Sequence, residues 1–150
     1  MSASFTFDDS LWPLLISRLT GVLADKQYSE YLARLTAYVE RGERYVCISD
    51  LRRAGLFTAA QRQMQVAWIR QHEVSLRERV LGNATLITSA PIRLSLSLIY
   101  HLKPLPMPNV VVADMNAAVR YILGKLEEGG LVSEAERIRL HFGLPGTHVG

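Results

Sequence analysis

The pattern of apolar and polar positions predicts short strands separated by longer helices. The continuous apolar run at residues 45–48 is typical of a strand that is buried on both faces. Five strands are expected in all, at residues 4–7, 11–19, 45–48, 81–88 and 110–112. Residues 8–10 are expected to form the turn after the first strand. Because Pro13 cannot donate a ladder hydrogen bond, the second strand lies at an edge or begins its regular pairing after this residue.

Apolar residues at helical spacing predict the helices that lie between and after these strands. They are expected at residues 25–41, 59–79, 92–102, from 115 to the Gly129-Gly130 pair, and at residues 133–142. Thr58 and Asp114 are expected to be N-caps, and Ser133 with Glu136 reads as a capping box. In the helix at residues 59–79, four residues at a spacing of four are expected to form the buried stripe: Met64, Trp68, His72 and Leu76.

One segment carries conflicting signals. The leucines and serines at residues 94–98 alternate with the period of a strand, yet Ser89-Ala90-Pro91 is a good helix opening. A strand directly after residue 88 would also lack a turn, so a helix is the favoured interpretation. The proline-rich residues 104–108 then form an extended connector.

The composition fits a single domain. With 49% hydrophobic residues among 150, the chain can bury a substantial core without disulfides or metal. We expect a compact core at residues 5–128, followed by a helix and tail at residues 129–150. The element order predicts the α/β class: one mixed, mostly parallel five-stranded sheet with four to five helices, in which the first two strands are the antiparallel exception.

Common catalytic and cofactor motifs are absent from the sequence. The four histidines are scattered, and there is no glycine-rich phosphate loop and no G-x-S-x-G nucleophile motif. Cys47 lies inside the apolar strand, where a small buried residue is the expected role. We therefore expect no enzyme activity, no catalytic residue, no metal and no cofactor.

Charge and hydropathy limit the partners and the location. The net charge is only +3, with acidic residues interspersed among the basic ones, so no nucleic-acid partner is expected. No run approaches the roughly 18 apolar residues that a membrane span needs, and the first ten residues resemble no secretion signal. We expect a cytoplasmic protein without membrane insertion.

The polar residues that follow the third strand are the candidate site. They are Asp50, Arg52, Arg53 and Thr58, with residues 52–55 expected to form an exit loop. One interpretation is structural: Asp50 and Thr58 bond to loop or helix amides, and the arginines are solvated. The other is that this loop presents a charged contact surface whose hydroxyls can be modified.

Two segments carry a resemblance to a known family. SDLRRAGLFTAAQRQ after the third strand and ATLITSAPIRLSLSLIYHL after the next helix resemble the STAS domain family, which includes sulfate-transporter and anti-sigma-factor-antagonist domains. The resemblance covers about residues 5–126 and is closest to small stand-alone bacterial members. It implies a helix at residues 92–102. It also implies a protein partner that docks on the loop before the second helix and on that helix, here residues 52–58 with Arg62 as a further candidate. Regulatory members are phosphorylated on a serine of a D-S-S-G motif; here LFTAAQ stands at that place, so Thr58 is the candidate phosphorylation site.

Three functional hypotheses follow. The leading one is a non-enzymatic regulatory or adaptor domain that binds a protein partner of unknown identity through the loop and helix after the third strand. The alternative is a small-ligand or lipid-binding domain whose cavity is enclosed by Tyr28, Tyr31, Trp68 and the apolar residues 94–100. The third is a homodimer that uses residues 133–142 as its contact.

Overall fold

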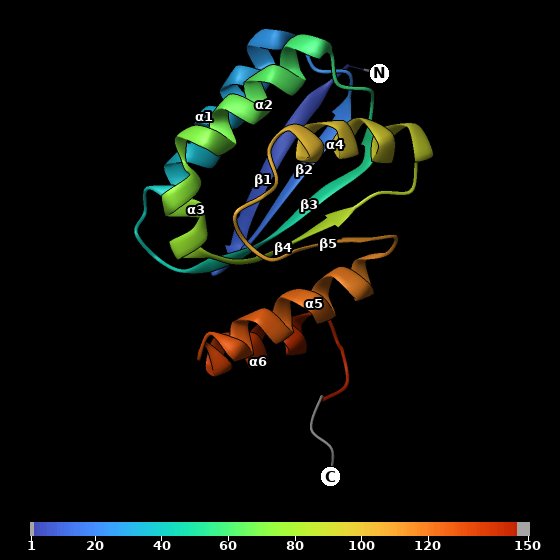
Figure 1. Ribbon diagram of the computed structural model, residues 1–150. Coiled ribbons are helices and arrows are strands. Elements are labelled where there is room, and N and C mark those ends of the chain that lie inside the picture. Colours follow the sequence, from blue (N-terminus) through green and yellow to red (C-terminus); the bar gives the residue numbers. More distant parts are fainter. Residues whose placement is uncertain (1, 147–150) are drawn as a thin grey trace.

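A single five-stranded sheet forms the centre of the molecule (Figure 1). The computed structural model describes residues 2–146. The strands are β1 (Ser4–Leu11), β2 (Leu14–Gly21), β3 (Tyr45–Ala54), β4 (Val80–Leu86) and β5 (Asn109–Val112), in the spatial order β1-β2-β3-β4-β5. β1 pairs antiparallel with β2, and all later neighbours are parallel. The predicted mixed sheet with one antiparallel strand is confirmed.

Helices cover both faces of this sheet (Figure 1). They are α1 (Asp25–Val39), α2 (Ala59–Gln71), α3 (Glu73–Arg79), α4 (Ala90–Leu102), α5 (Met115–Glu128) and α6 (Val132–His141). α1 to α4 lie on one face, and α5 and α6 lie on the other. The described residues thus contain six helices, against four to five expected, because the helix predicted at residues 59–79 breaks at His72 into α2 and α3.

Alternate residues of each central strand face different helix layers. Leu14, Ile16, Val46 and Ile48 belong to the core that α5 and α6 close. Their neighbours, such as Leu15 and Tyr45, face the α1 to α4 side. A strand that is covered on both faces has no reason to alternate apolar with polar residues, which explains the continuous apolar run at residues 45–48.

The first hairpin differs from the prediction. Residues 8–10 belong to β1, and the chain reverses at Trp12 and Pro13, where the Trp12 amide donates to the Asp9 carbonyl at 3.0 Å. The bond before Pro13 is cis. Polar residues fit in β1 because it is an edge strand with half of its positions open to solvent. The regular pairing of β2 begins after Pro13, as predicted.

Two parallel strands also differ from their expected bounds. β3 was expected to stop near Asp50 but continues to Ala54, so the exit loop predicted at residues 52–55 is wrong. The polar residues are retained in the strand because β2 continues beside them and supplies hydrogen-bond partners. β4 begins one residue earlier than expected and ends at Leu86, two residues before the expected end at residue 88.

Two details of the helices need correction. In α2 and α3 the fully buried residues include Gln61, Val66 and Ile69, whereas three members of the predicted stripe, at positions 64, 68 and 72, are half-buried. The reason is that α2 packs against both α1 and α4, so the buried residues are those that face these helices and the core between them. Leu76 is buried as predicted.

The last helix begins one residue earlier than expected. Its N-cap is Leu131, without a side-chain cap, so the predicted capping box of Ser133 and Glu136 is wrong. Glu136 instead pairs with Arg139 one turn later. The tail expected after this helix extends to residue 150, and its residues 147–150 lie outside the described part of the chain.

The ambiguous segment after β4 is helical, as predicted. Ser89 caps α4, its hydroxyl accepting a hydrogen bond from the Ile92 amide at 3.4 Å. Ser95 and Leu96 are buried, while Leu94, Leu98 and Leu102 form an exposed stripe at a spacing of four. The strand-like alternation therefore reflects a helix with leucines on two of its faces.

Candidate functional site

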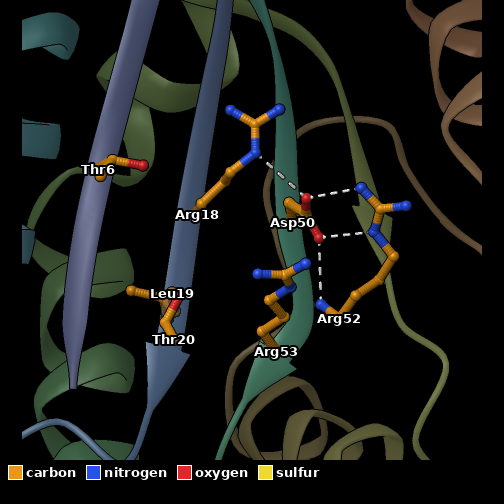
Figure 2. Close-up of a pocket in the computed structure, with 7 residues that line it drawn as sticks. All are labelled: Thr6, Arg18, Leu19, Thr20, Asp50, Arg52 and Arg53. Carbon is orange, nitrogen blue, oxygen red and sulfur yellow. Dashed lines mark hydrogen bonds and ion pairs between the residues drawn. The ribbon is translucent and has the colours of Figure 1, made fainter. Parts of the chain in front are cut away.

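The layer of α5 and α6 leaves part of its sheet face uncovered. These helices pack on the first halves of β2 and β3, whereas the second halves of both strands border a hollow of about 640 Å³. We call this feature the arginine hollow. Its lining residues are Thr6, Arg18, Leu19, Thr20, Asp50, Arg52 and Arg53 (Figure 2).

An irregularity in the pairing of β2 with β3 puts two consecutive arginines on this face. Arg18 is opposite Asp50, but the next paired residue, Thr20, is opposite Arg53, so β3 carries one extra residue here. Regular alternation would turn either Arg52 or Arg53 toward the helices α1 and α2. Leu51 enters that core. Because of the extra residue, the guanidinium groups of Arg52 and Arg53 both stay on the side of the hollow (Figure 2).

Asp50 organises the charges of the hollow. Its carboxylate accepts two hydrogen bonds from the Arg52 guanidinium, at 2.9 and 3.0 Å, and one from the Arg52 amide at 3.1 Å. The Arg18 Nε lies 3.4 Å away on the other side (Figure 2). Burial raises the pKa of Asp50, but the hydrogen bonds from Arg52 and the charges of Arg52 and Arg18 outweigh burial, so the net pKa is lowered. Asp50 is therefore an ionised clamp for two arginines.

The end of β3 leads into a small apolar surface. Val22 and Leu56 are 56% and 54% exposed, which is unusual for large apolar side chains. Gly55 packs directly on Val22, since a Cβ on Gly55 would lie 2.4 Å from the Val22 Cγ2. The residues that follow β2 and β3 are therefore in direct contact, and Arg53, two positions before Gly55 in the sequence, is also exposed.

Thr58 and Gln61 fasten the start of α2. The Thr58 hydroxyl accepts a hydrogen bond from the Gln61 amide at 3.0 Å, and the Gln61 Oε1 accepts from the Thr58 amide at 3.3 Å, which makes a capping box. The Gln61 Nε2 also donates to the Leu23 carbonyl at 2.6 Å and to Asp25 at 3.1 Å. The predicted N-cap at Thr58 is confirmed.

The five candidate residues of the sequence do not form a single cluster. Asp50, Arg52 and Arg53 share the arginine hollow. Thr58 and Arg62 belong to the start of α2, on the other face of the sheet, and the Arg62 side chain donates to the Phe57 carbonyl at 3.0 Å.

Sequence reasoning missed two residues that complete these sites. Arg18 pairs with Asp50 across neighbouring strands, and strand register could not be derived from the sequence. Gln61 could have been predicted, because Thr58-x-x-Gln61 before an amphipathic segment is a capping-box signature.

The aromatic residues proposed to enclose a ligand do line internal space. That internal space consists of two adjoining cavities between the sheet and α1, α2 and α4. They measure about 70 and 50 Å³ and share four lining residues: Tyr31, Ser49, Gln65 and Tyr100. Tyr28 lines one cavity, and Trp68 and Cys47 line the other. Burial raises the pKa of Cys47 to about 12, which makes the thiol unreactive. Within residues 2–146, no group of three His, Cys, Asp or Glu side chains is arranged to hold a metal ion.

Solved structures with the same fold confirm the expected architecture. One is an uncharacterised protein of the DUF3478 family with a SpoIIAA-like fold from Shewanella loihica PV-4, at 12% identity, a TM-score of 0.60 and coverage of 81% of this chain and 96% of that one. An anti-sigma factor antagonist from Mycobacterium paratuberculosis matches at 11% identity, with a TM-score of 0.55 and coverage of 81% and 94%. SpoIIAA in its unphosphorylated form matches at 14% identity, with a TM-score of 0.56 and coverage of 79% and 96%.

These likenesses establish the fold: the chain has a SpoIIAA-like fold. No protein family and no curated protein matches its sequence. Among the described residues, no helix has the length and apolar character needed to cross a membrane.

Proposed function

We propose that this SpoIIAA-like domain is a non-enzymatic regulator or adaptor that binds a protein partner through the end of β3 and the start of α2. Two of its structural neighbours are anti-sigma factor antagonists, and a regulatory domain that works by protein contact fits the same fold. The proposal places it in the cytoplasm, where a lone thiol such as Cys47 stays reduced.

The observation that carries the proposal is the surface formed by Val22, Leu56 and Arg53. Protein interfaces combine an apolar centre with arginine and a polar rim. Two exposed apolar side chains beside an exposed arginine provide that combination here. Arg52 lies in the arginine hollow, where Asp50 holds it and Arg18 in place, and Arg62 lies in the first turn of α2.

Thr58 is the proposed regulatory position on this surface. Its hydroxyl caps α2 and lies 3.4 Å from the Asp25 carboxylate. A phosphate added there carries about two negative charges, so it would repel Asp25 and break the cap, although the helix dipole favours an anion at this end. Phosphorylation would thus alter the shape and the charge of the contact surface together.

The test is affinity capture from native cell extract with the domain as bait, followed by binding measurements with the purified captured protein. The double variant Arg52→Glu, Arg53→Glu and the single variant Leu56→Asp are expected to lose the partner. The matched controls are Arg70→Glu on the last turn of α2 and Val74→Asp on α3, both exposed and remote from this surface. Equal affinity of all four variants for the captured protein would refute the surface assignment.

The internal cavities are too small for the alternative function, a lipid or small-ligand carrier. Ligand pockets usually enclose about 300–1,000 Å³, whereas the aromatic cavities measure about 70 and 50 Å³. Those volumes suit a few water molecules and not a lipid chain. Native mass spectrometry that shows a bound small molecule would revive this alternative.

The homodimer hypothesis centres on α6. Its exposed apolar residues Val132 and Leu140 are the candidate contacts, at 59% and 65% exposure. Removing the whole helix is a poor test, because Ala135 and Ile138 are buried against α5 and the core would open. Light scattering on Leu140→Asp tests this contact while leaving the core intact, and a dimer that persists in this variant would exclude Leu140 from the interface.

A further inference from the structure

We infer that the arginine hollow binds the phosphate group of a phosphomonoester. This inference does not depend on the protein partner proposed above, and it concerns the purified domain alone. It rests on the charge, the donor groups and the size of the hollow.

The charge of the hollow matches a dianion. Three guanidinium groups, of Arg18, Arg52 and Arg53, surround a single carboxylate, that of Asp50, so the cluster carries an excess of two positive charges (Figure 2). A phosphomonoester carries about 1.5 to 2 negative charges near pH 7. A carboxylate ligand would neutralise only half of this excess.

Asp50 leaves most of the guanidinium donors available. Arg52 uses its Nε and Nη2 for Asp50, and Arg18 turns its Nε to the same carboxylate. The Nη groups of Arg18 and the Nη1 of Arg52 are not engaged by Asp50. Among residues 2–146, no hydrogen bond or ion pair uses the Arg53 side chain, so all N–H donors of its guanidinium group are available to a ligand.

Asp50 also prepares the site for binding. It holds Arg52 by two hydrogen bonds, which fixes one plane of donors before any ligand arrives and lowers the entropy lost on binding. The hydroxyl groups of Thr6 and Thr20 line the same hollow and can donate to further oxygens. Arginine forks and hydroxyls are the groups that proteins use for phosphate oxygens.

The size of the hollow indicates that the phosphate arrives on a carrier. The space of about 640 Å³ lies within the range of small-ligand pockets and far exceeds one phosphate. The carrier is either a small molecule or a phosphorylated side chain of a protein. Both present the same phosphomonoester chemistry to the arginines, and the experiment separates them.

The experiment is calorimetric titration of the purified domain with inorganic phosphate at about 0.15 M salt, where non-specific attraction is screened. We expect saturable binding that weakens roughly tenfold in Arg18→Ala and in Arg53→Ala, since each loses a charge-assisted hydrogen bond. Arg53→Lys keeps the charge but lacks the planar guanidinium group that can donate two parallel hydrogen bonds, and we expect it to weaken binding as well. Arg70→Ala, which removes an exposed arginine of α2, should bind as the unaltered domain does.

Two further ligands identify the carrier. Glycerol 3-phosphate represents the small-molecule source, and a phosphoserine peptide, compared with its unphosphorylated form, represents the protein source. Tighter binding of either one than of inorganic phosphate supports the site and names its carrier. The inference is overturned if no saturable phosphate binding occurs, or if Arg70→Ala weakens it as much as Arg18→Ala does. Circular dichroism melts verify that each variant is folded.

Discussion

The buried Gln61 side chain stabilises the start of α2, which belongs to the candidate contact surface. Replacing this residue tests whether its hydrogen bonds hold the surface in place. Its side chain is only 1% exposed. It joins the segment after β2 to the start of α2, because it donates to the Leu23 carbonyl and to Asp25 and accepts from the Thr58 amide. The perturbation is Gln61→Ala, which deletes all three hydrogen bonds at once.

The expected loss is about 2 kcal/mol of unfolding free energy. Leu23 is buried, so its carbonyl loses a donor that water cannot readily replace, at a cost of about 1–3 kcal/mol. The bonds to the exposed Asp25 and Thr58 can be replaced by water and add little. The void left by a buried side chain adds to the loss, while the higher helix propensity of alanine and the released side-chain entropy offset part of it.

Urea denaturation followed by circular dichroism measures this loss. With a slope of about 1–3 kcal/mol per molar urea, a loss of 2 kcal/mol lowers the midpoint by roughly 1 M. The matched control is Gln63→Ala, the same change on an exposed position of α2, which should stay within about 0.5 kcal/mol. If Gln61→Ala costs no more than this control, the hydrogen bonds to Leu23 and Thr58 do not hold the loop, and our reasoning about the surface fails.

Three more predictions concern single positions. Gly55→Ala should destabilise the domain by about 1–3 kcal/mol, because the new Cβ meets the Val22 side chain at 2.4 Å and its backbone nitrogen at 3.0 Å; an unchanged melting temperature would contradict this close approach. Ser95→Ala should leave stability unchanged or raise it, since the buried Ser95 hydroxyl has no hydrogen-bond partner among the described residues; a clear loss in urea denaturation would indicate an internal water or another partner. The pKa of Asp50 is lowered from 3.8, so the stability that its ion pairs contribute is present above pH 4 and lost as the pH falls through the lower folded value; Asp50→Asn should flatten this part of the acid-stability profile, and an unaltered profile would contradict the clamp.

Local signals in the sequence were sufficient for much of the fold. Thr58 and Asp114 cap their helices because a short polar side chain before an apolar stripe satisfies free amides wherever the helix ends up. Ser89-Ala90-Pro91 opened α4 although the following leucines alternate, since the helix start depends only on neighbouring residues. The order of strands and helices, together with the resemblance to STAS domains, yielded the mostly parallel sheet.

The candidate site depended on contacts between distant segments, which no local pattern encodes. Asp50 was singled out from the sequence as the end of the strand, and Arg52 and Arg53 as part of an exit loop, because polar residues at the end of an apolar run usually leave the sheet. Only the neighbouring β2 keeps them in β3, and only the extra residue in that pairing turns both arginines to one face beside Arg18. The sequence by itself determined which elements form and which residues carry charge. The tertiary structure decided that α5 and α6 leave the second halves of β2 and β3 open on one face, because coverage depends on how whole layers pack. It alone assembled the arginine hollow.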